Sequence, residues 1–115
     1  METPEKVLSR LQDQDIIYLT RSLIRIPSET GNEKAIANYL AQELEGWGLR
    51  VQLAESRAGR PSVLSWVPGE AEEFGLILVG HIDTVPPDQG GSESWRSDPY
   101  QADQIGNRLY GLGSA

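Results

Sequence analysis

Apolar residues recur at helical spacing in the first quarter of the chain, between about residues 13 and 25. Side chains three and four positions apart share one face of a helix, so this pattern predicts an amphipathic helix with its apolar stripe in the core. Pro27 is expected to end this helix, because its ring disfavours helical geometry at the preceding residue. The preceding dozen residues are polar and are expected to begin with a frayed end. The stripe consists of Ile16, Ile17, Leu19, Leu23 and Ile24.

Residues 28–33 are predicted to form a loop, and a second amphipathic helix is predicted to follow it and to run to about Trp47. Thr30, followed three positions later by Glu33, forms a capping-box pattern, in which two side chains satisfy two otherwise unpaired amides at a helix start. The glycines on either side of Trp47 supply the stop. The apolar face of this helix consists of Ile36, Leu40, Leu44 and Trp47.

Strands are predicted where apolar and polar residues alternate and turn residues follow. The first two strands are joined by a turn at residues 56–61, whose Arg57 and Arg60 we interpret as exposed rather than as contacts for a substrate carboxylate. The last two flank Gly106-Asn107, a sequence typical of a β-hairpin with a tight turn. The four predicted strands are residues 49–54, 63–67, 101–105 and 108–110.

The aliphatic run Leu76–Val79 predicts a strand that is buried on both faces, because a half-exposed strand would alternate. The run stops at Gly80, the only histidine, His81, follows at once, and Asp83 lies two positions later. Residues i and i+2 of an extended segment point to the same side. Both side chains are therefore expected to project together from the carboxyl end of a central strand, where open α/β sheets bind ligands.

The residues alone leave three interpretations of His81 and Asp83 open. The histidine can be a hydrogen-bonded loop residue at a strand end. The pair can be a metal ligand with a carboxylate that orients it, or a general base with its orienting group. A loop of residues 84–97, rich in Pro, Gly and Ser, follows, and loops of this length in compact domains are usually functional or disordered.

The predicted elements give an α/β fold class in which helices pack on a mixed β-sheet. The 115 residues are 38% hydrophobic and 23% charged, as expected for a globular domain. A formal net charge of −7 argues against nucleic acid as a partner. No apolar run is long enough for a membrane helix, and the start lacks a signal-peptide pattern. With no cysteine present, a cytoplasmic protein without a membrane partner is predicted.

The string Leu-Val-Gly-His-Ile-Asp-Thr-Val-Pro, residues 78–86, resembles the first metal motif of a zinc-dependent amidohydrolase and exopeptidase family, peptidase family M20. This family includes acetylornithine deacetylase, succinyl-diaminopimelate desuccinylase and aminoacylase. Trp95, Asp98-Pro99-Tyr100 and the stretch 108–115 are similar to the part of the family that follows. Leu112 departs from the Gly-Arg-Gly that members commonly have. The resemblance makes metal binding the favoured role of His81.

The resemblance implies a di-zinc exopeptidase-like catalytic domain that hydrolyses an amide bond in an N-acyl amino acid or small peptide through a metal-activated water. Two zinc ions are implied for the complete site, with cobalt as an alternative metal. His81 would be a metal ligand, and Asp83 would be the catalytic residue behind it that fixes the orientation of the ring. A homodimer is one option for the full-length protein.

By the same resemblance, residues 1–115 are expected to be the N-terminal part of the catalytic domain, the front portion of a larger enzyme. In the family, an aspartate that bridges the zinc ions follows the position of Ala115. The glutamate base, the other ligands and the lid or dimerisation domain are expected beyond it. Because catalytic zinc generally has three protein ligands, the isolated chain is expected to be inactive and to bind metal weakly.

Two other function classes remain as alternatives. One is a truncated non-catalytic protein that acts as an interaction module and pairs through an open sheet edge. The other is a stand-alone binder of a small ligand that uses the loop after His81. An unfinished sheet exposes an edge, so we also expect this chain to be marginally stable or prone to aggregation.

Overall fold

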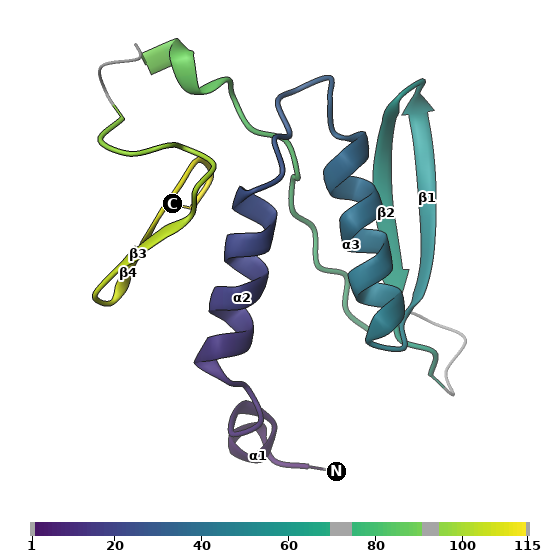
Figure 1. The fold of residues 1–115 in the computed structure, drawn as a ribbon. Helices are drawn as coiled ribbons and strands as arrows, with labels where there is room; N and C mark the ends of the chain where they lie inside the picture. Colours follow the sequence, from purple (N-terminus) through teal and green to yellow (C-terminus); the bar gives the residue numbers. More distant parts are fainter. Residues whose placement is uncertain (1, 70–74, 91–94, 115) are drawn as a thin grey trace. The chain divides into compact units, whose positions relative to one another are not determined.

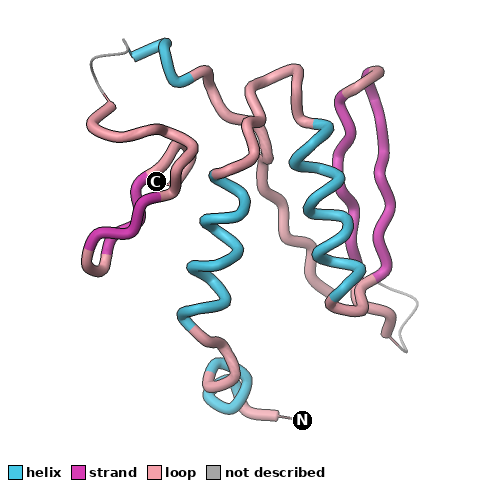
Figure 2. Tube along the Cα trace, viewed as in Figure 1, coloured by secondary structure: helices cyan, strands magenta, loops and turns pink. Residues whose placement is uncertain are grey.

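The computed structural model describes residues 2–69, 75–90 and 95–114 (Figure 1). The chain divides into two compact units, one formed by residues 1–26 and 90–115 and the other by residues 27–89. Helices and strands are both present, which confirms the predicted α/β content (Figure 2). The predicted mixed sheet is not found in the described residues, whose strands form two separate antiparallel pairs.

The described elements follow the chain in the order helix, helix, helix, hairpin, short 3₁₀ helix and hairpin. None of the described helices has the length and apolar character needed to cross a lipid bilayer. The elements are α1 (Pro4–Leu8), α2 (Asp13–Ile24), α3 (Lys34–Gly46), β1 (Arg50–Arg57), β2 (Arg60–Trp66), η1 (Pro87–Gly90), β3 (Asp103–Ile105) and β4 (Arg108–Tyr110).

In the unit of residues 27–89, α3 packs against the β1–β2 hairpin (Figure 1). The strands pair antiparallel, with Leu53 opposite Val63. They continue through most of the region predicted as a turn and leave only Ala58 and Gly59 between them. Gly59 has a φ of 77°, which glycine adopts without strain, so the connection can be tighter than the sequence pattern indicated. The buried apolar side chains of α3 are Ile36, Ala37 and Ala41.

The second predicted helix is present, but its predicted capping box is wrong. The helix starts at Lys34, and Glu33 occupies the N-cap position without a side-chain capping hydrogen bond. The side chains of Thr30 and Glu33 instead bind groups outside the helix. At the other end, Gly48 has a φ of 83° and its amide donates to the Glu45 carbonyl. The predicted glycine stop is therefore confirmed for Gly48, whereas Gly46 is the last residue of the helix.

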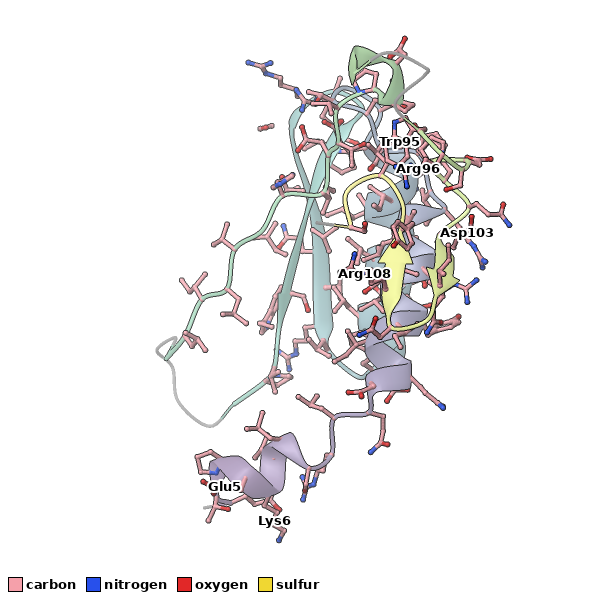
Figure 3. All side chains as sticks on the ribbon, turned by 90° about the vertical axis from the view of Figure 1, so that its left-hand side faces the viewer. Glu5, Lys6, Trp95, Arg96, Asp103 and Arg108 are labelled. Carbon is pink, nitrogen blue, oxygen red and sulfur yellow. The ribbon has the colours of Figure 1, made fainter. Side chains whose placement is uncertain are left out.

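The aliphatic run at residues 76–79, predicted to be a buried central strand, forms no strand in the structure. Its side chains are exposed, from 72% for Ile77 to 93% for Val79. Figure 3 shows this segment running apart from the β1–β2 hairpin, with side chains on both sides of it. The prediction failed because a strand needs neighbouring backbone to take up its N–H and C=O groups, and the described residues provide none here.

In the unit of residues 1–26 and 90–115, α2 confirms the first predicted helix, but its apolar stripe is less buried than predicted. Ile24 is only 6% exposed, whereas Ile16 is 55% exposed. A short helix, α1, also forms where a polar, frayed start was expected. Thr3 caps it by accepting from the Lys6 amide at 3.4 Å, and Pro4 stands in its first turn. Both are ordinary helix-start signals.

The predicted C-terminal hairpin is confirmed as β3 and β4, whose labelled residues Asp103 and Arg108 are seen in Figure 3. Gly106, at the first central position of its turn, has a φ of 61°. After β4 the chain folds back, and the Leu112 amide donates to the Pro99 carbonyl at 2.8 Å. This contact closes the loop before β3 against the residues after β4.

Gly111 lies so close to Ile24 that a side chain has no room there. A Cβ atom at Gly111 would overlap Cγ2 of Ile24 and would lie 3.3 Å from the Pro99 carbonyl oxygen. Because Ile24 is buried, it has little freedom to move aside. The glycine therefore allows the residues after β4 to pack directly on α2.

Replacing Gly111 by alanine is expected to destabilise this unit by about 1–3 kcal/mol, the usual cost of forcing a methyl group into a packed interior. Gly46→Ala is the matched control, since a Cβ there meets nothing within 4 Å. Urea unfolding of the wild type and both variants measures the difference. Equal unfolding midpoints for the two variants would contradict the prediction.

Candidate functional site

His81 and Asp83 contact each other in the structure. Nδ1 of His81 lies 2.8 Å from the Asp83 backbone carbonyl oxygen and 3.3 Å from Oδ1 of the Asp83 carboxylate. A carbonyl oxygen can only accept a hydrogen bond, so in a neutral ring Nδ1 carries the proton and donates. Nε2 then has the lone pair. The His81 side chain is 84% exposed and that of Asp83 is 33% exposed, so the imidazole is open to solvent.

The Asp83 carboxylate is held on its other side by Thr30. The Thr30 hydroxyl donates to Oδ2 at 2.7 Å, while Oδ1 faces the His81 ring. This Thr30 hydrogen bond is the main cause that lowers the pKa of Asp83, and it outweighs the opposing effect of burial. The carboxylate is therefore ionised at neutral pH, and its two oxygens have separate partners.

The Thr30 loop is also joined to the His81 motif through the backbone. Glu29 and Thr84 form a parallel bridge, in which the Thr84 amide donates to the Ser28 carbonyl at 2.9 Å and the Thr30 amide donates to the Thr84 carbonyl at 3.1 Å. Figure 1 shows the chain between α2 and α3 beside the segment that leads into η1. Ser28, only 2% exposed, serves this backbone connection.

Glu33 and Arg60 fix the far end of the same loop. The Arg60 guanidinium forms a fork on the Glu33 carboxylate, with Nε 3.0 Å from Oε1 and 3.1 Å from Oε2, and its terminal Nη2 also contacts Oε1. The Gly31 amide donates to Oε1 at 2.9 Å. Glu33 is only 4% exposed. The interpretation of Arg60 as an exposed turn residue is therefore wrong: it lies half-buried in β2 and binds an acid 27 positions away.

The Arg60 hydrogen bonds, with a further contribution from the Gly31 amide, lower the pKa of Glu33 from its ordinary 4.5 to about 2. The same pair raises the pKa of Arg60. A carboxylate with a depressed pKa stabilises the folded state fully above its unfolded value, and this stabilisation is lost as the pH falls through its folded value. The relevant window therefore extends from about pH 4.5 down to about pH 2.

Glu33→Gln is expected to remove this acid dependence. The wild type should exceed the variant in stability above about pH 4.5, and the difference should shrink toward zero near pH 2. Urea unfolding at pH 6, 4 and 2.5 measures this difference, with Glu55→Gln at an exposed position of β1 as the control. If the difference in stability between the wild type and Glu33→Gln is the same at all three pH values, the ion pair is not the origin of that difference.

The described residues provide one position of a metal site rather than a complete site. His81 offers Nε2, and Asp83 and Thr30 stand behind the ring rather than beside Nε2. No group of three or more His, Asp or Glu side chains that could hold a metal ion occurs in the part of the chain that the structure describes. The arrangement fits a single ligand with its orienting carboxylate, and the metal role of His81 stays a prediction.

Comparison with known proteins shows which proteins this chain is similar to. No family model matches the chain. Acetylornithine deacetylase of Aliivibrio salmonicida (strain LFI1238) is 40% identical over 87 residues, which is 76% of this chain and 21% of that protein. Acetylornithine deacetylase of Vibrio cholerae (serotype O1, strain M66-2) is 37% identical over 87 residues. That of Vibrio atlanticus (strain LGP32) is 39% identical over 85 residues.

The predicted family is confirmed by these relatives. The chain spans about a fifth of their length, since the matched residues are 21% of each protein. The sequence pattern predicted that His81 and Asp83 lie together, and the structure shows this contact. The Thr30 and Arg60 contacts were missed, because neither the 53 positions between Thr30 and Asp83 nor the 27 between Glu33 and Arg60 follow a local spacing rule.

Proposed function

We propose that this chain contributes the first metal motif to a metal-dependent hydrolase that cleaves an amide bond in N-acyl amino acids or small peptides. Similarity to proteins named acetylornithine deacetylase supports the deacetylase type. The observation that carries the proposal is the His81–Asp83 pair. Its contact at Nδ1 leaves the Nε2 lone pair as the available ligand atom.

In this proposal, Nε2 of His81 binds one of two zinc ions, and cobalt is an alternative. A bound metal would supply Lewis-acid polarisation of the scissile carbonyl and activation of water. Asp83 and its own carbonyl hold the imidazole through Nδ1, which fixes the tautomer and makes the ring a stronger ligand. The remaining ligands and the general base would come from residues other than those described.

The proposal extends to the whole protein. Residues 1–115 correspond to the N-terminal part of the catalytic domain, and the lid or dimerisation domain belongs to other sequence. The partner is a small N-acyl amino acid or peptide, and the protein acts in the cytoplasm, as a homodimer if the dimerisation domain is present. The described residues provide one ligand of the proposed set, so we expect the isolated chain to be inactive.

The test begins with the coding DNA, read in frame beyond the codon for Ala115. The product of the complete reading frame is then assayed with zinc or cobalt on N-acetylornithine and other N-acyl amino acids. The proposal is supported if hydrolysis depends on added metal and is lost in His81→Ala. That variant should also bind about one of the two metal equivalents. An equally active His81→Ala variant would refute the metal-binding role of His81. Zinc-dependent hydrolysis by residues 1–115 alone would refute the claim that the site in this chain is incomplete.

One observation favours a second candidate, an interaction module. Residues 76–79 expose four consecutive aliphatic side chains, between 72% and 93% each. Exposed apolar surface of this kind commonly marks a site of association or an aggregation-prone segment. A stop codon directly after Ala115, combined with a stable complex through residues 76–79, would favour this candidate over the hydrolase.

A further inference from the structure

The loop between α2 and α3 does more than connect two helices. It is joined to Thr84 by two backbone hydrogen bonds, and its last residue, Glu33, is clamped by Arg60 of β2. Ser28 and Glu33, near its two ends, are 2% and 4% exposed. The loop is therefore fixed at both ends, and Thr30 lies between these fixed points.

Thr30 has no role in starting α3. The N-cap of that helix is Glu33, and the Thr30 hydroxyl donates to Oδ2 of Asp83 at 2.7 Å. Oδ1 of the same carboxylate lies 3.3 Å from Nδ1 of His81. A carboxylate bound through one oxygen cannot rotate freely, so the Thr30 hydrogen bond determines that the other oxygen stays beside the imidazole.

We propose that Thr30 is a positioning residue of the site: its hydroxyl holds the Asp83 carboxylate beside Nδ1 of His81. There the carboxylate adds to the Asp83 backbone carbonyl in keeping the ring as the Nδ1–H tautomer, with Nε2 free to bind a metal. The role of Nε2 rests on the proposed function. The hydrogen-bond relay from Thr30 through Asp83 to His81 rests on the contacts alone.

The backbone makes this relay possible at so great a sequence separation. The Thr30 amide donates to the Thr84 carbonyl, so the main chain on which the hydroxyl stands is registered against the residue after Asp83. The Arg60 fork on Glu33 resists displacement of the loop from its other end. The position of the Thr30 hydroxyl beside Oδ2 is therefore determined by a backbone that is held at both ends of the loop.

Because His81 is the only histidine, its ring nitrogens can be followed without assignment in the ¹⁵N-labelled 115-residue chain. The spectra are recorded without metal at about pH 8.5, well above the ordinary histidine pKa of about 6.5. The wild type and Thr30→Ser should show the Nδ1–H form as the major tautomer. In Thr30→Val the ratio of Nδ1–H to Nε2–H should fall about fivefold, as expected for the loss of one net hydrogen bond.

Thr20→Val is the matched control, since the Thr20 hydroxyl donates to the Ile16 carbonyl within α2. An unchanged tautomer ratio in Thr30→Val, or an equal fall in Thr20→Val, would overturn the proposal. If Thr30→Val loses the amide signals of the β1–β2 hairpin, Thr30→Ala replaces it, and an unchanged ratio in that variant overturns the proposal equally.

A second readout separates this proposal from the proposed function. In the product of the complete reading frame, cobalt affinity should fall about 10–100-fold in Thr30→Val and recover in Thr30→Ser. A change in the tautomer with no cobalt binding by any variant would refute the metal role of His81 and leave the relay intact. An unchanged tautomer with normal cobalt binding would refute the relay and leave the proposed function intact.

Discussion

Replacing Arg60 by methionine is expected to lower the melting temperature of the α3–β1–β2 unit by on the order of 10 °C at pH 7. Glu33 is 4% exposed, and the fork from Arg60 accounts for most of the hydrogen bonds of its carboxylate. Methionine fills a similar volume but supplies no charge. The carboxylate would then be left buried without its counter-ion, which is more costly than replacing both partners by neutral groups.

Two comparisons isolate the ion pair as the cause. Arg57→Met removes an arginine from the exposed end of β1, opposite Arg60, and should have little effect. The double variant Arg60→Met/Glu33→Gln should recover much of the lost stability, because no buried charge remains. Thermal unfolding followed by far-UV circular dichroism measures all four chains. A double variant less stable than Arg60→Met would show that packing, not charge, determines the loss.

The second large effect concerns the exposed run at residues 76–79. We expect the wild-type chain to self-associate through this segment. It combines high β-propensity, exposed side chains and no charge with a backbone that pairs with none of the described strands. Leu78, 85% exposed, is the position to test. Leu78→Lys should raise the concentration at which oligomers are detected at least about tenfold, because burial of one leucine contributes roughly 1.5–3 kcal/mol.

Leu8→Lys is the control for this experiment. It makes the same substitution and the same change in net charge at another exposed leucine, 62% exposed in α1. Sedimentation velocity over a range of concentrations compares the three chains. If Leu8→Lys reduces association as much as Leu78→Lys does, net charge rather than the segment at residues 76–79 controls association, and the interaction-module alternative loses its support.

Local patterns predicted the local elements. The period of apolar residues located α2 and α3, and Gly106-Asn107 located the last turn, because these elements are determined by residues a few positions apart. The capping box failed for a physical reason. Thr30 and Glu33 had stronger partners available in Asp83 and Arg60, and a pattern of four residues holds no information on such distant groups.

The candidate site was predicted only as far as its local part. His81 and Asp83 are two positions apart, so their proximity could be anticipated from the chain. The sequence could not show whether a buried strand precedes them, because burial and strand pairing depend on neighbouring segments. An aliphatic run has the same composition whether or not such neighbours are present, and here the described residues leave it exposed.

The bridge between Glu29 and Thr84 has a consequence for how the molecule folds. The β1–β2 hairpin and its contact with α3 join residues close in sequence, whereas the bridge closes a loop of more than fifty residues. Long closures are slow because their entropy is lost before their contacts form. The hairpin and α3 should therefore assemble first, and the surroundings of His81 should be completed last. The amides of Thr30 and Thr84 would then become protected from hydrogen exchange later than those of β1 during refolding.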